Sequence, residues 1–497
     1  MSVALYTVAF GGALLLVLSL VQQRRKSLLP PGPPGDPVVG HLLRMPSADS
    51  PLIFHQWSKI YGPVMHLKVL GRSMVILDTY QAAVDLLDKR GSIYSDRPKL
   101  TLYELLGWKP SLPFLQYGKQ FNTQRQMHQT YLSRHKVENY KPMQTQEARM
   151  LVRNLLESAP ERHEEFLSRF ATGIITQIVA GHRITSDADP YLRMSSMVYE
   201  AMSKTGPPGS SPLDFFPLRE CLLLLRFDEY HLYTVQHFPP WFPGTKHMGV
   251  EAGVATPSFI LEQLEQMKEV EDMEQLKGAA AAMFAAGEAT VTWSSLCIFI
   301  LAMIQHPEFQ DKAQKEIDAV VGNLRLPEFR DRSELPFVEG ILQETLRWRP
   351  AVPLGVPHRV MEDNIYHGML IPKGSLVFPN IKGMSLDESV YSTPTSFRPE
   401  RYLPKPAGKG EPYFNNVAFG FGRRICTGRY FADNSLWIAI VSILATCRIS
   451  NMVDESGKII VPDSSLTDGI VSHPRDIRCI ISPRSAGTKE LIMETVV

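Results

Sequence analysis

A glycine-rich loop around a single cysteine, residues 419–428, constrains this chain more than any other segment. The loop reads Phe-Gly-Phe-Gly-Arg-Arg-Ile-Cys-Thr-Gly, and the apolar residues that follow at 431–432 and 436–441 are typical of a buried helix. Cys426 therefore precedes a helix N-terminus, where backbone N–H groups and the helix dipole favour an anion. A thiol in this place is expected to shift toward the thiolate, the form that ligates iron. The glycines allow tight turns and a close approach to a flat ligand.

The pattern Phe-Gly-x-Gly-x-Arg-x-Cys-x-Gly in this loop resembles the haem-binding loop of the cytochrome P450 superfamily. The resemblance implies that Cys426 is the proximal ligand of the iron of haem b. It also implies that Arg424 contacts a haem propionate and that Phe419 belongs to the cofactor-binding loop. A buried structural cysteine is the alternative, since that is the usual fate of a free Cys. It accounts for the sulfur but not for the surrounding glycines and arginines.

A long alanine-rich segment, residues 277–304, predicts a second buried helix. Gly287 removes side-chain bulk, and the hydroxyl of Thr290 can compete for a backbone carbonyl, so a groove or kink can open there. In the family this groove holds dioxygen, and the resemblance makes Thr290 and Glu288 the candidate catalytic residues for proton delivery. Ala289 stands at the family's acid position, so Glu288 is turned from that position by about 100°. Alone, the motif is equally consistent with core packing.

The segment 117–125 resembles the start of the family's helix C, which usually reads Trp-x-x-x-Arg. Phe121 stands at the Trp position and Arg125 at the Arg position, and their i, i+4 spacing places both on one helix face. The resemblance implies that Arg125 pairs with a haem propionate; a solvated surface arginine is the alternative. Phe121 lacks the indole N–H donor. His358 stands where many relatives carry a propionate-binding arginine, and a solvated histidine is the alternative there.

Two further segments resemble a structural motif of the family. Glu344 and Arg347 lie in a helical run, and their i, i+3 spacing brings the carboxylate beside the guanidinium. Alone this would most often be a surface ion pair. The segment Phe-Arg-Pro-Glu-Arg-Tyr follows at residues 397–402, and the combination resembles the family's Glu-x-x-Arg plus Arg triad. We therefore expect Glu344, Arg347 and Arg401 to be structural residues.

The N-terminal segment predicts a membrane anchor. Residues 1–21 are almost wholly apolar and long enough for one bilayer crossing, and a positive cluster follows at 22–26. That order favours an uncleaved, single-pass anchor with the catalytic domain in the cytosol, and the resemblance implies the endoplasmic reticulum membrane. The expected organisation is a transmembrane segment at 1–21, a proline-rich hinge at 22–50, a mainly α catalytic domain with a small β region at 51–485, and a disordered tail at 486–497.

The expected β region includes a hairpin formed by residues 64–69 and 74–77, and a strand pair formed by residues 364–369 and 376–380. Residues 469–474 should form a further hairpin whose tip reaches the pocket. The stretch 217–277 departs from the family pattern, which indicates either a lineage-specific lid or a mistaken gene model.

Charge and cysteine usage exclude other classes. The formal net charge is +1, and no basic block that would suit nucleic acid lies beyond the cluster after the anchor. The five cysteines are scattered and form no CxxC pair, which argues against a disulfide framework or a zinc site.

The resemblance implies a haem-thiolate monooxygenase that inserts one oxygen atom from O2 into a lipophilic small molecule. It is strongest to fungal microsomal members, so a terpenoid or aromatic natural-product intermediate is the expected substrate. NADPH-cytochrome P450 reductase is the expected partner, docking near Arg423 and Arg429. Two alternatives stay open: peroxide or rearrangement chemistry, suggested by Ala289, and a degenerate, non-catalytic haem protein, suggested by the altered middle of the chain.

Overall fold

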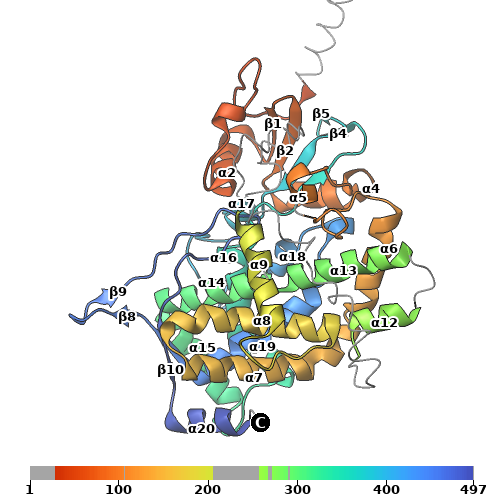
Figure 1. Cartoon of the computed structure of the whole chain (residues 1–497). Coiled ribbons are helices and arrows are strands. Elements are labelled where there is room, and N and C mark those ends of the chain that lie inside the picture. The colour runs from red at the N-terminus through yellow and green to blue at the C-terminus, as the bar shows by residue number, and fades with distance from the viewer. Residues whose placement is uncertain (1–27, 106, 205–256, 267–270, 289–290, 496–497) are drawn as a thin grey trace, which may run out of the picture.

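The computed structural model describes residues 28–105, 107–204, 257–266, 271–288 and 291–495. Helices dominate these residues and the strands are few and short, which confirms the predicted mainly α fold with a small β region. Figure 1 shows β1, β2, β4 and β5 together at one end of the molecule, while α7, α8, α14, α15 and α19 stack at the other. The predicted transmembrane segment 1–21 lies outside the described residues.

Five of the helices, α2, α7, α9, α15 and α16, carry a proline in the first turn, where its missing N–H costs nothing. The α-helices are α2 (Ser50–Tyr61), α3 (Tyr80–Ala83), α4 (Gly91–Tyr94), α5 (Thr101–Leu105), α6 (Lys119–Tyr131), α7 (Lys141–Glu157), α8 (His163–Ala180), α9 (Pro190–Lys204), α12 (Phe259–Gln266), α13 (Glu271–Glu288), α14 (Val291–Gln305), α15 (Pro307–Val320), α16 (Pro336–Trp348), α17 (Ile381–Ser385), α18 (Asn415–Ala418), α19 (Arg429–Thr446) and α20 (Ala486–Thr495). The 3-10 turns are η1 (Leu42–Arg44), η3 (Lys136–Tyr140), η4 (Pro160–Arg162), η7 (Phe329–Glu334), η8 (Pro399–Tyr402) and η9 (Gly422–Arg424), and η2 (Val84–Asp88) is a π turn.

The strands form one four-stranded sheet and three two-stranded pairs, with the larger sheet in the order β1-β2-β6-β3. Strand β6 runs parallel to β2 and antiparallel to β3, so the first hundred residues and the segment after α16 share one sheet. The strands are β1 (Val64–Val69), β2 (Arg72–Leu77), β3 (His358–Arg359), β4 (Asn364–Tyr366), β5 (Met369–Ile371), β6 (Leu376–Pro379), β7 (Cys447–Ser450), β8 (Met452–Val453), β9 (Ile459–Ile460) and β10 (Ile480–Pro483).

Two hairpin turns decide how the predicted strands pair. The β1–β2 hairpin is confirmed; its turn consists of Leu70 and Gly71, both with positive φ, as two-residue hairpins require. The predicted pairing of 364–369 with 376–380 is wrong. His367 and Gly368 also have positive φ, so the chain turns there and β4 pairs with β5, which leaves β6 free to join the larger sheet.

The core is built around α14 and α19, which are apolar on all sides and in contact with each other. Leu296 and Phe299 of α14 and Ile440 and Val441 of α19 are fully buried. The predicted apolar runs are therefore confirmed as buried helices. The segment 273–305 is long and apolar enough to cross a membrane. Its apolar stretch that meets this criterion is 93% buried inside the protein, as in a core helix.

The C-terminal tail is not disordered as predicted. Residues 486–495 form α20, which packs against α7 and α19 and buries Ile492. The expected hairpin at 469–474 is reduced to a turn with one isolated bridge between Leu466 and Pro474. Residues 205–256, which include most of the unusual stretch, lie outside the described part of the chain.

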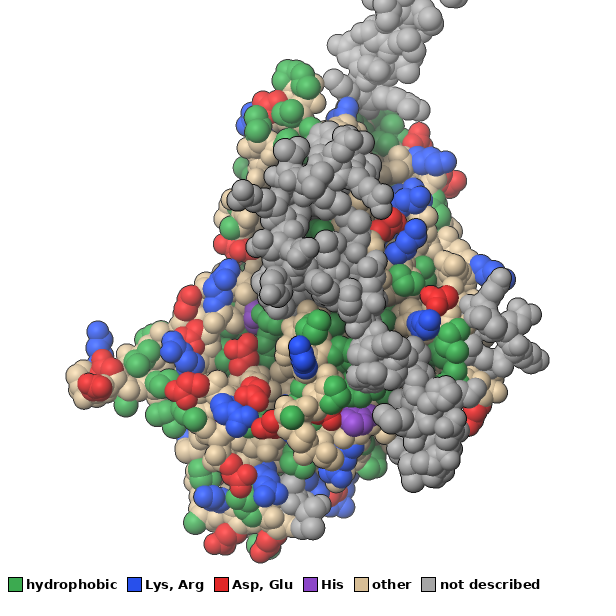
Figure 2. Space-filling model, in the orientation of Figure 1, with side chains coloured by type: hydrophobic (Ala, Val, Ile, Leu, Met, Phe, Trp, Pro, Cys, Tyr) green, Lys and Arg blue, Asp and Glu red, His purple; other side chains and the backbone are tan. Residues whose placement is uncertain are grey.

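Charged side chains of both signs are mixed on the surface. Figure 2 shows Lys and Arg interspersed with Asp and Glu over the described part of the face in view. This distribution agrees with the near-neutral net charge of +1.

Candidate functional site

The cysteine loop connects η9 to α19, and Cys426 lies just before the helix N-terminus, as predicted. The Cys426 N–H donates to the carbonyl of Phe419 at 2.9 Å, which closes the loop on itself. Gly420 and Gly422 have φ of +77° and +56°. A Cβ on Gly422 would lie 2.1 Å from the carbonyl oxygen of Leu87, so only glycine fits there.

The expected shift of the Cys426 thiol toward thiolate is wrong for the protein alone. Burial raises the pKa of this thiol above its usual value. The backbone N–H groups of Gly428 and Arg429 and the charges of Arg429 and Arg125 act in the opposite direction and do not overcome burial. A bound metal cation would add positive charge beside the sulfur and favour the thiolate.

A mostly apolar cavity opens over the cysteine loop. Cys426 forms one wall, and Ala285, Ala286 and Gly287 of α13 belong to another, which confirms that the alanine-rich helix and the cysteine loop share one cavity. Ile470 and Val471 also line it, so the predicted reach of the C-terminal turn is confirmed.

Gly287 has a packing role that the sequence did not reveal. A Cβ there would lie 2.5 Å from Cδ1 of Ile175, so the glycine allows α8 to approach α13 closely. Thr290 and Ala289 lie outside the described residues, and Glu288 is the last residue of α13. The predicted catalytic pair therefore stays a prediction.

Arg424 and Arg125 both line the cavity. Arg424 donates from Nε to the Ser95 carbonyl at 2.7 Å and from Nη2 to the Leu115 carbonyl at 2.8 Å. Arg125 donates from Nη1 to the carbonyl of Ile425, next to the cysteine, at 3.1 Å. Burial, together with the charge of Arg125, lowers the pKa of Arg424 to about 9 despite the opposing effect of Asp96. Burial also lowers the pKa of Arg125.

Arg97 is a third arginine of this cavity, and sequence reasoning missed it. Its guanidinium is buried and donates to the carbonyls of Pro113, Val356 and Pro357 at 2.8–2.9 Å. Its sequence neighbour Asp96 pairs instead with Arg359, Nε to Oδ2 at 2.8 Å. No local spacing could have revealed this, because the partners of Arg97 lie far along the chain.

The three arginines indicate what the cavity accepts. None of them forms an ion pair with a carboxylate of the described residues, and burial disfavours an uncompensated cation. Burial lowers the pKa of Arg97 well below its ordinary value, as expected for a missing counter-charge. A flat, sulfur-ligated group with carboxylates at one edge would supply it. The residues present therefore fit haem, with its iron on the cysteine side and its propionates toward the arginines.

His358 also lines the cavity, where the sequence predicted a propionate contact. Its Nδ1 donates to the Tyr94 carbonyl at 2.7 Å, so a donor at Nε2 requires a second proton. Burial, then the charge of Arg97, lowers the pKa of His358 well below its usual value. Without an anion beside it, His358 is neutral and offers no second donor.

Phe121 lies on α6 and is buried. The guanidinium carbon of Arg424 is 3.7 Å from its ring centroid and that of Arg125 is 5.9 Å away. Phe121 therefore contributes a ring face that stabilises two cations, instead of the hydrogen bond that an indole would donate.

His128 is a second residue that sequence reasoning missed. Its Nε2 donates to the Ala279 carbonyl of α13 at 2.9 Å, so Nδ1 accepts from the Thr427 hydroxyl at 3.2 Å. Burial lowers the pKa of His128 to about 4, which keeps the ring neutral. It follows Arg125 by three residues, so the helical spacing that placed Arg125 could have found it.

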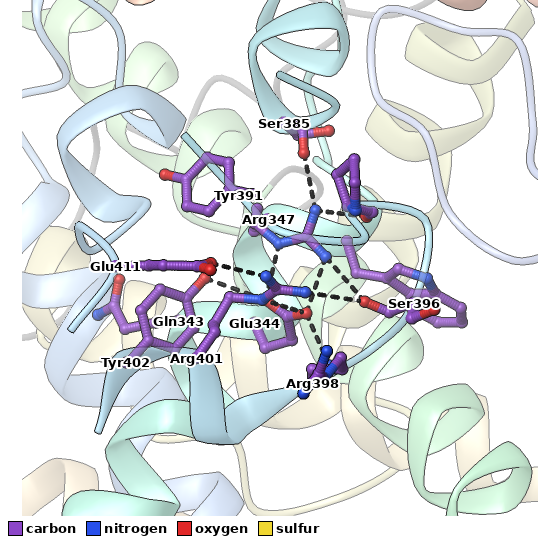
Figure 3. Close-up of polar contacts among 12 residues, drawn as sticks. Gln343, Glu344, Arg347, Ser385, Tyr391, Ser396, Arg398, Arg401, Tyr402 and Glu411 are labelled. Carbon is purple, nitrogen blue, oxygen red and sulfur yellow. Dashed lines mark hydrogen bonds and ion pairs between the residues drawn. The ribbon is translucent and has the colours of Figure 1, made fainter. Parts of the chain in front are cut away.

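The expected structural triad is present and fully buried (Figure 3). Both oxygens of Glu344 accept from Arg347 at 2.7 Å, and both accept from Nε of Arg401 at 3.0 and 3.1 Å. A fourth member, Glu411, was not predicted; it accepts from Nη1 of Arg401 at 2.7 Å. The hydroxyl of Tyr402 also donates to Glu344, at 3.0 Å. The network binds α16 to the segment that precedes the cysteine loop.

Arg423 and Arg429 lie beside Cys426 in the chain. Arg423 is exposed, and its Nη1 donates to the Tyr117 hydroxyl at 2.6 Å. Arg429 is half-buried, and its Nη1 donates to the Cys426 carbonyl at 2.9 Å.

Comparison with known proteins identifies what this arrangement is similar to. A family profile described as Cytochrome P450 matches residues 30–480. The chain is 37% identical to cytochrome P450 monooxygenase claR of Ampulloclitocybe clavipes, over 99% of this chain and 93% of that protein. It is 36% identical to cytochrome P450 monooxygenase 136 of Postia placenta, over 95% and 92% of the two chains. Cytochrome P450 monooxygenase COX2 of Coprinopsis cinerea is 34% identical, over 95% and 92%.

Proposed function

Because the chain belongs to the cytochrome P450 family and is a P450 monooxygenase with haem b as cofactor, we propose that Cys426 is its proximal iron ligand. The observation that carries this role is the position of the Cys426 sulfur in a cavity that it shares with three arginines lacking carboxylate partners among the described residues. Thiolate-ligated haem iron supplies the activation of dioxygen for insertion of one oxygen atom into the substrate.

The protein's own residues hold and orient the cofactor. Arg97, Arg125 and Arg424 bind the two propionates, and their bonds to backbone carbonyls fix the guanidinium groups in place. His358 joins them once the propionate charge favours its second proton. The loop from Phe419 to Cys426 lines the cavity and would hold the cofactor on the side of the Cys426 sulfur.

The wall formed by α13 would border the space in which the substrate's reacting group meets the oxygen that the cofactor activates. Ala285 and Ala286 keep this wall apolar, which excludes water from the reacting centre. Thr290 holds a proton at its hydroxyl for delivery to the oxygen, and Glu288 supplies protons through water, since Ala289 offers no carboxylate.

The substrate is a lipophilic small molecule, and we assign it to the terpenoid or aromatic natural-product intermediates. The apolar cavity and the fungal relatives named as monooxygenases support this assignment.

The electron donor is NADPH-cytochrome P450 reductase, which docks next to the cysteine loop at the exposed Arg423 and the half-buried Arg429. The apolar segment 1–21 anchors the protein in the endoplasmic reticulum membrane as a single pass, with the catalytic domain in the cytosol. Charge reversal at Arg423 and Arg429 should slow haem reduction; an unchanged rate would contradict the docking site.

Turnover tests the proposed reaction directly. Full-length protein supplied with the reductase, NADPH and isotopically labelled dioxygen should place one labelled oxygen atom in the product. Products made without NADPH, or with peroxide alone at an equal rate, would contradict monooxygenation driven by the reductase.

A further inference from the structure

A second cleft lies beside the haem cavity, bordered by α2, the larger sheet, the end of α16, α17 and the C-terminal turn. It encloses about 1140 Å³, enough for a small-molecule ligand. Gly355 and Ile470 line both the cleft and the haem cavity. The two spaces therefore meet at these residues.

Lys382 gives this cleft an unusual charge. It lies on α17 directly after Ile381, which lines the haem cavity, whereas Lys382 lines the cleft. Its Nζ donates to the Trp348 carbonyl at 2.8 Å and forms no ion pair with a carboxylate of the described chain. Burial, then repulsion by Arg347 and Arg349, lowers the pKa of Lys382 to about 7.

Arg349 is the second cation of the cleft without a carboxylate partner in the described ranges. Its guanidinium carbon lies 4.4 Å from the Trp348 ring centroid, and Nη1 donates to the Ser464 carbonyl. Burial lowers the pKa of Arg349, and the charge of Asp463 opposes that effect without cancelling it. The packing on Trp348 holds the guanidinium in place beside Lys382.

The cleft has three other charged side chains, Asp49, Asp468 and Arg475. Arg475 and Asp468 form an ion pair at 3.8 Å, and an oxygen of Asp468 also accepts the backbone N–H of Asp49 at 3.2 Å. Much of the remaining lining is apolar: Leu52, Phe54, Leu354, Phe378 and Leu386. Lys382 and Arg349 are thus the two basic side chains of the cleft that form no ion pair with a described carboxylate, and an anionic ligand would supply that partner and favour the charged form of Lys382.

We propose that this cleft binds the carboxylate of a lipophilic acid between Lys382 and Arg349, with the apolar body of the molecule passing Gly355 and Ile470 into the haem cavity. The inference rests on the proposed function and narrows its substrates to lipophilic molecules that carry an acid group. A carboxylate accepts charge-assisted hydrogen bonds from an ammonium and a guanidinium, and the apolar lining accommodates a hydrocarbon body.

A matched pair of probes tests the proposal. Dodecanoic acid and its methyl ester differ in charge but hardly in apolar surface, so titration calorimetry of each on the full-length, haem-loaded protein isolates the carboxylate. The acid should bind more tightly than the ester by roughly tenfold, as one charge-assisted hydrogen bond implies. Lys382→Gln and Arg349→Gln should each remove most of that preference while the ester's affinity stays the same.

Arg475→Gln is the matched control, since it removes a cleft arginine that already has a carboxylate partner. It should leave the acid-to-ester ratio unchanged. Equal affinities of the two probes for the native protein would overturn the proposal, as would an acid preference that survives in Lys382→Gln and Arg349→Gln. If Lys382→Gln does not fold, Arg349→Gln decides alone.

The carbon monoxide spectrum of the same protein preparation keeps the two proposals separate. A thiolate-type Soret band without an acid preference leaves the proposed function intact and removes only the acid site. Absence of that band would contradict the role of Cys426, whatever the probes show.

Discussion

Two groups of buried arginines in this molecule differ in how their charges are balanced. Arg347 and Arg401 surround Glu344 within a network of side chains that is complete within the chain (Figure 3). Arg97, Arg125 and Arg424 surround the cavity over Cys426 and bond mainly to backbone carbonyls. No carboxylate of the described residues pairs with them.

The comparison separates residues that hold the fold from residues that hold a ligand. A balanced buried network stabilises the protein with or without a cofactor, and breaking it leaves a charge unpaired. The arginines at the cavity cost free energy until an anion arrives, so their benefit appears only in the haem-bound protein. Substitutions in the two groups should therefore affect the cofactor-free and haem-bound proteins differently.

The largest effect is expected at Glu344. Glu344→Gln removes the charge shared by Arg347 and Arg401, which should lower the free energy of unfolding by about 3–5 kcal/mol with and without haem. Chemical denaturation of both forms measures this loss. Asp311→Asn, in the exposed pair with Arg448, is the control and should cost less than about 1 kcal/mol. Similar losses in the two variants would show that the network is not a structural centre.

Acid should lower the free energy of unfolding through His128, which lines the cavity over Cys426. Its pKa is lowered from 6.5 to about 4 in the folded state, so the unfolded chain binds the proton first as pH falls. The contribution is complete above pH 6.5 and is lost as pH falls toward 4, by about 3 kcal/mol in all. His128→Gln keeps a donor for the Ala279 carbonyl without titrating. Its stability should fall less steeply than that of the native protein over this range; parallel curves would contradict the assignment.

Replacing a cavity arginine should weaken haem binding and leave the stability of the cofactor-free protein nearly unchanged. Arg424→Gln removes a charged partner of the propionates and should weaken haem affinity by roughly 10–100-fold, equivalent to one charge-assisted hydrogen bond. The free energy of unfolding of the cofactor-free protein should stay within about 1 kcal/mol of the native value, because an uncompensated buried cation is removed as well. Haem titration and cofactor-free denaturation measure the two quantities.

The neighbouring Arg423→Gln is the control for that pair of measurements, since Arg423 is exposed and does not line the cavity. It should leave haem affinity unchanged. If Arg423→Gln and Arg424→Gln weaken haem affinity equally, the effect reflects the net charge of the loop and not a propionate contact.

The smallest effect is expected at Phe121, which presents its ring to Arg424 at 3.7 Å. Phe121→Leu keeps most of the apolar volume but removes the ring, and should weaken haem affinity by about 1 kcal/mol, the usual size of a cation–π contact. Phe121→Tyr retains the ring and should stay close to native. An equal loss in both variants would indicate a packing effect alone.

The features that the sequence predicted are those whose partners lie close along the chain. The spacing of Glu344 and Arg347, the cysteine loop before α19 and the β1–β2 hairpin all depend on neighbours within a few residues. The pairing of β4 with β5 was missed because it depends on the positive φ of His367 and Gly368, which the sequence pattern did not reveal. The tail was missed because the burial of Ile492 in α20 depends on contacts with distant helices.

The candidate site was predicted less completely for the same reason. Arg97 acts through the carbonyl of Val356, to which no local pattern connects it, whereas His128 lies one helical turn after Arg125 and only its partner, the carbonyl of Ala279, is distant in the sequence. The direction of the Cys426 pKa shift was wrong because the helix N-terminus was visible in the sequence, whereas the larger effect of burial was not. Charge balance in a cavity is a property of the folded chain.

The carbon monoxide spectrum of the native protein and of its Cys426 variants tests the central claim most directly. The account predicts a thiolate-type Soret band in the native protein, haem without that band in Cys426→His, and loss of haem in Cys426→Ala. A thiolate-type band that persists in either variant would contradict the account, because another sulfur would then hold the iron.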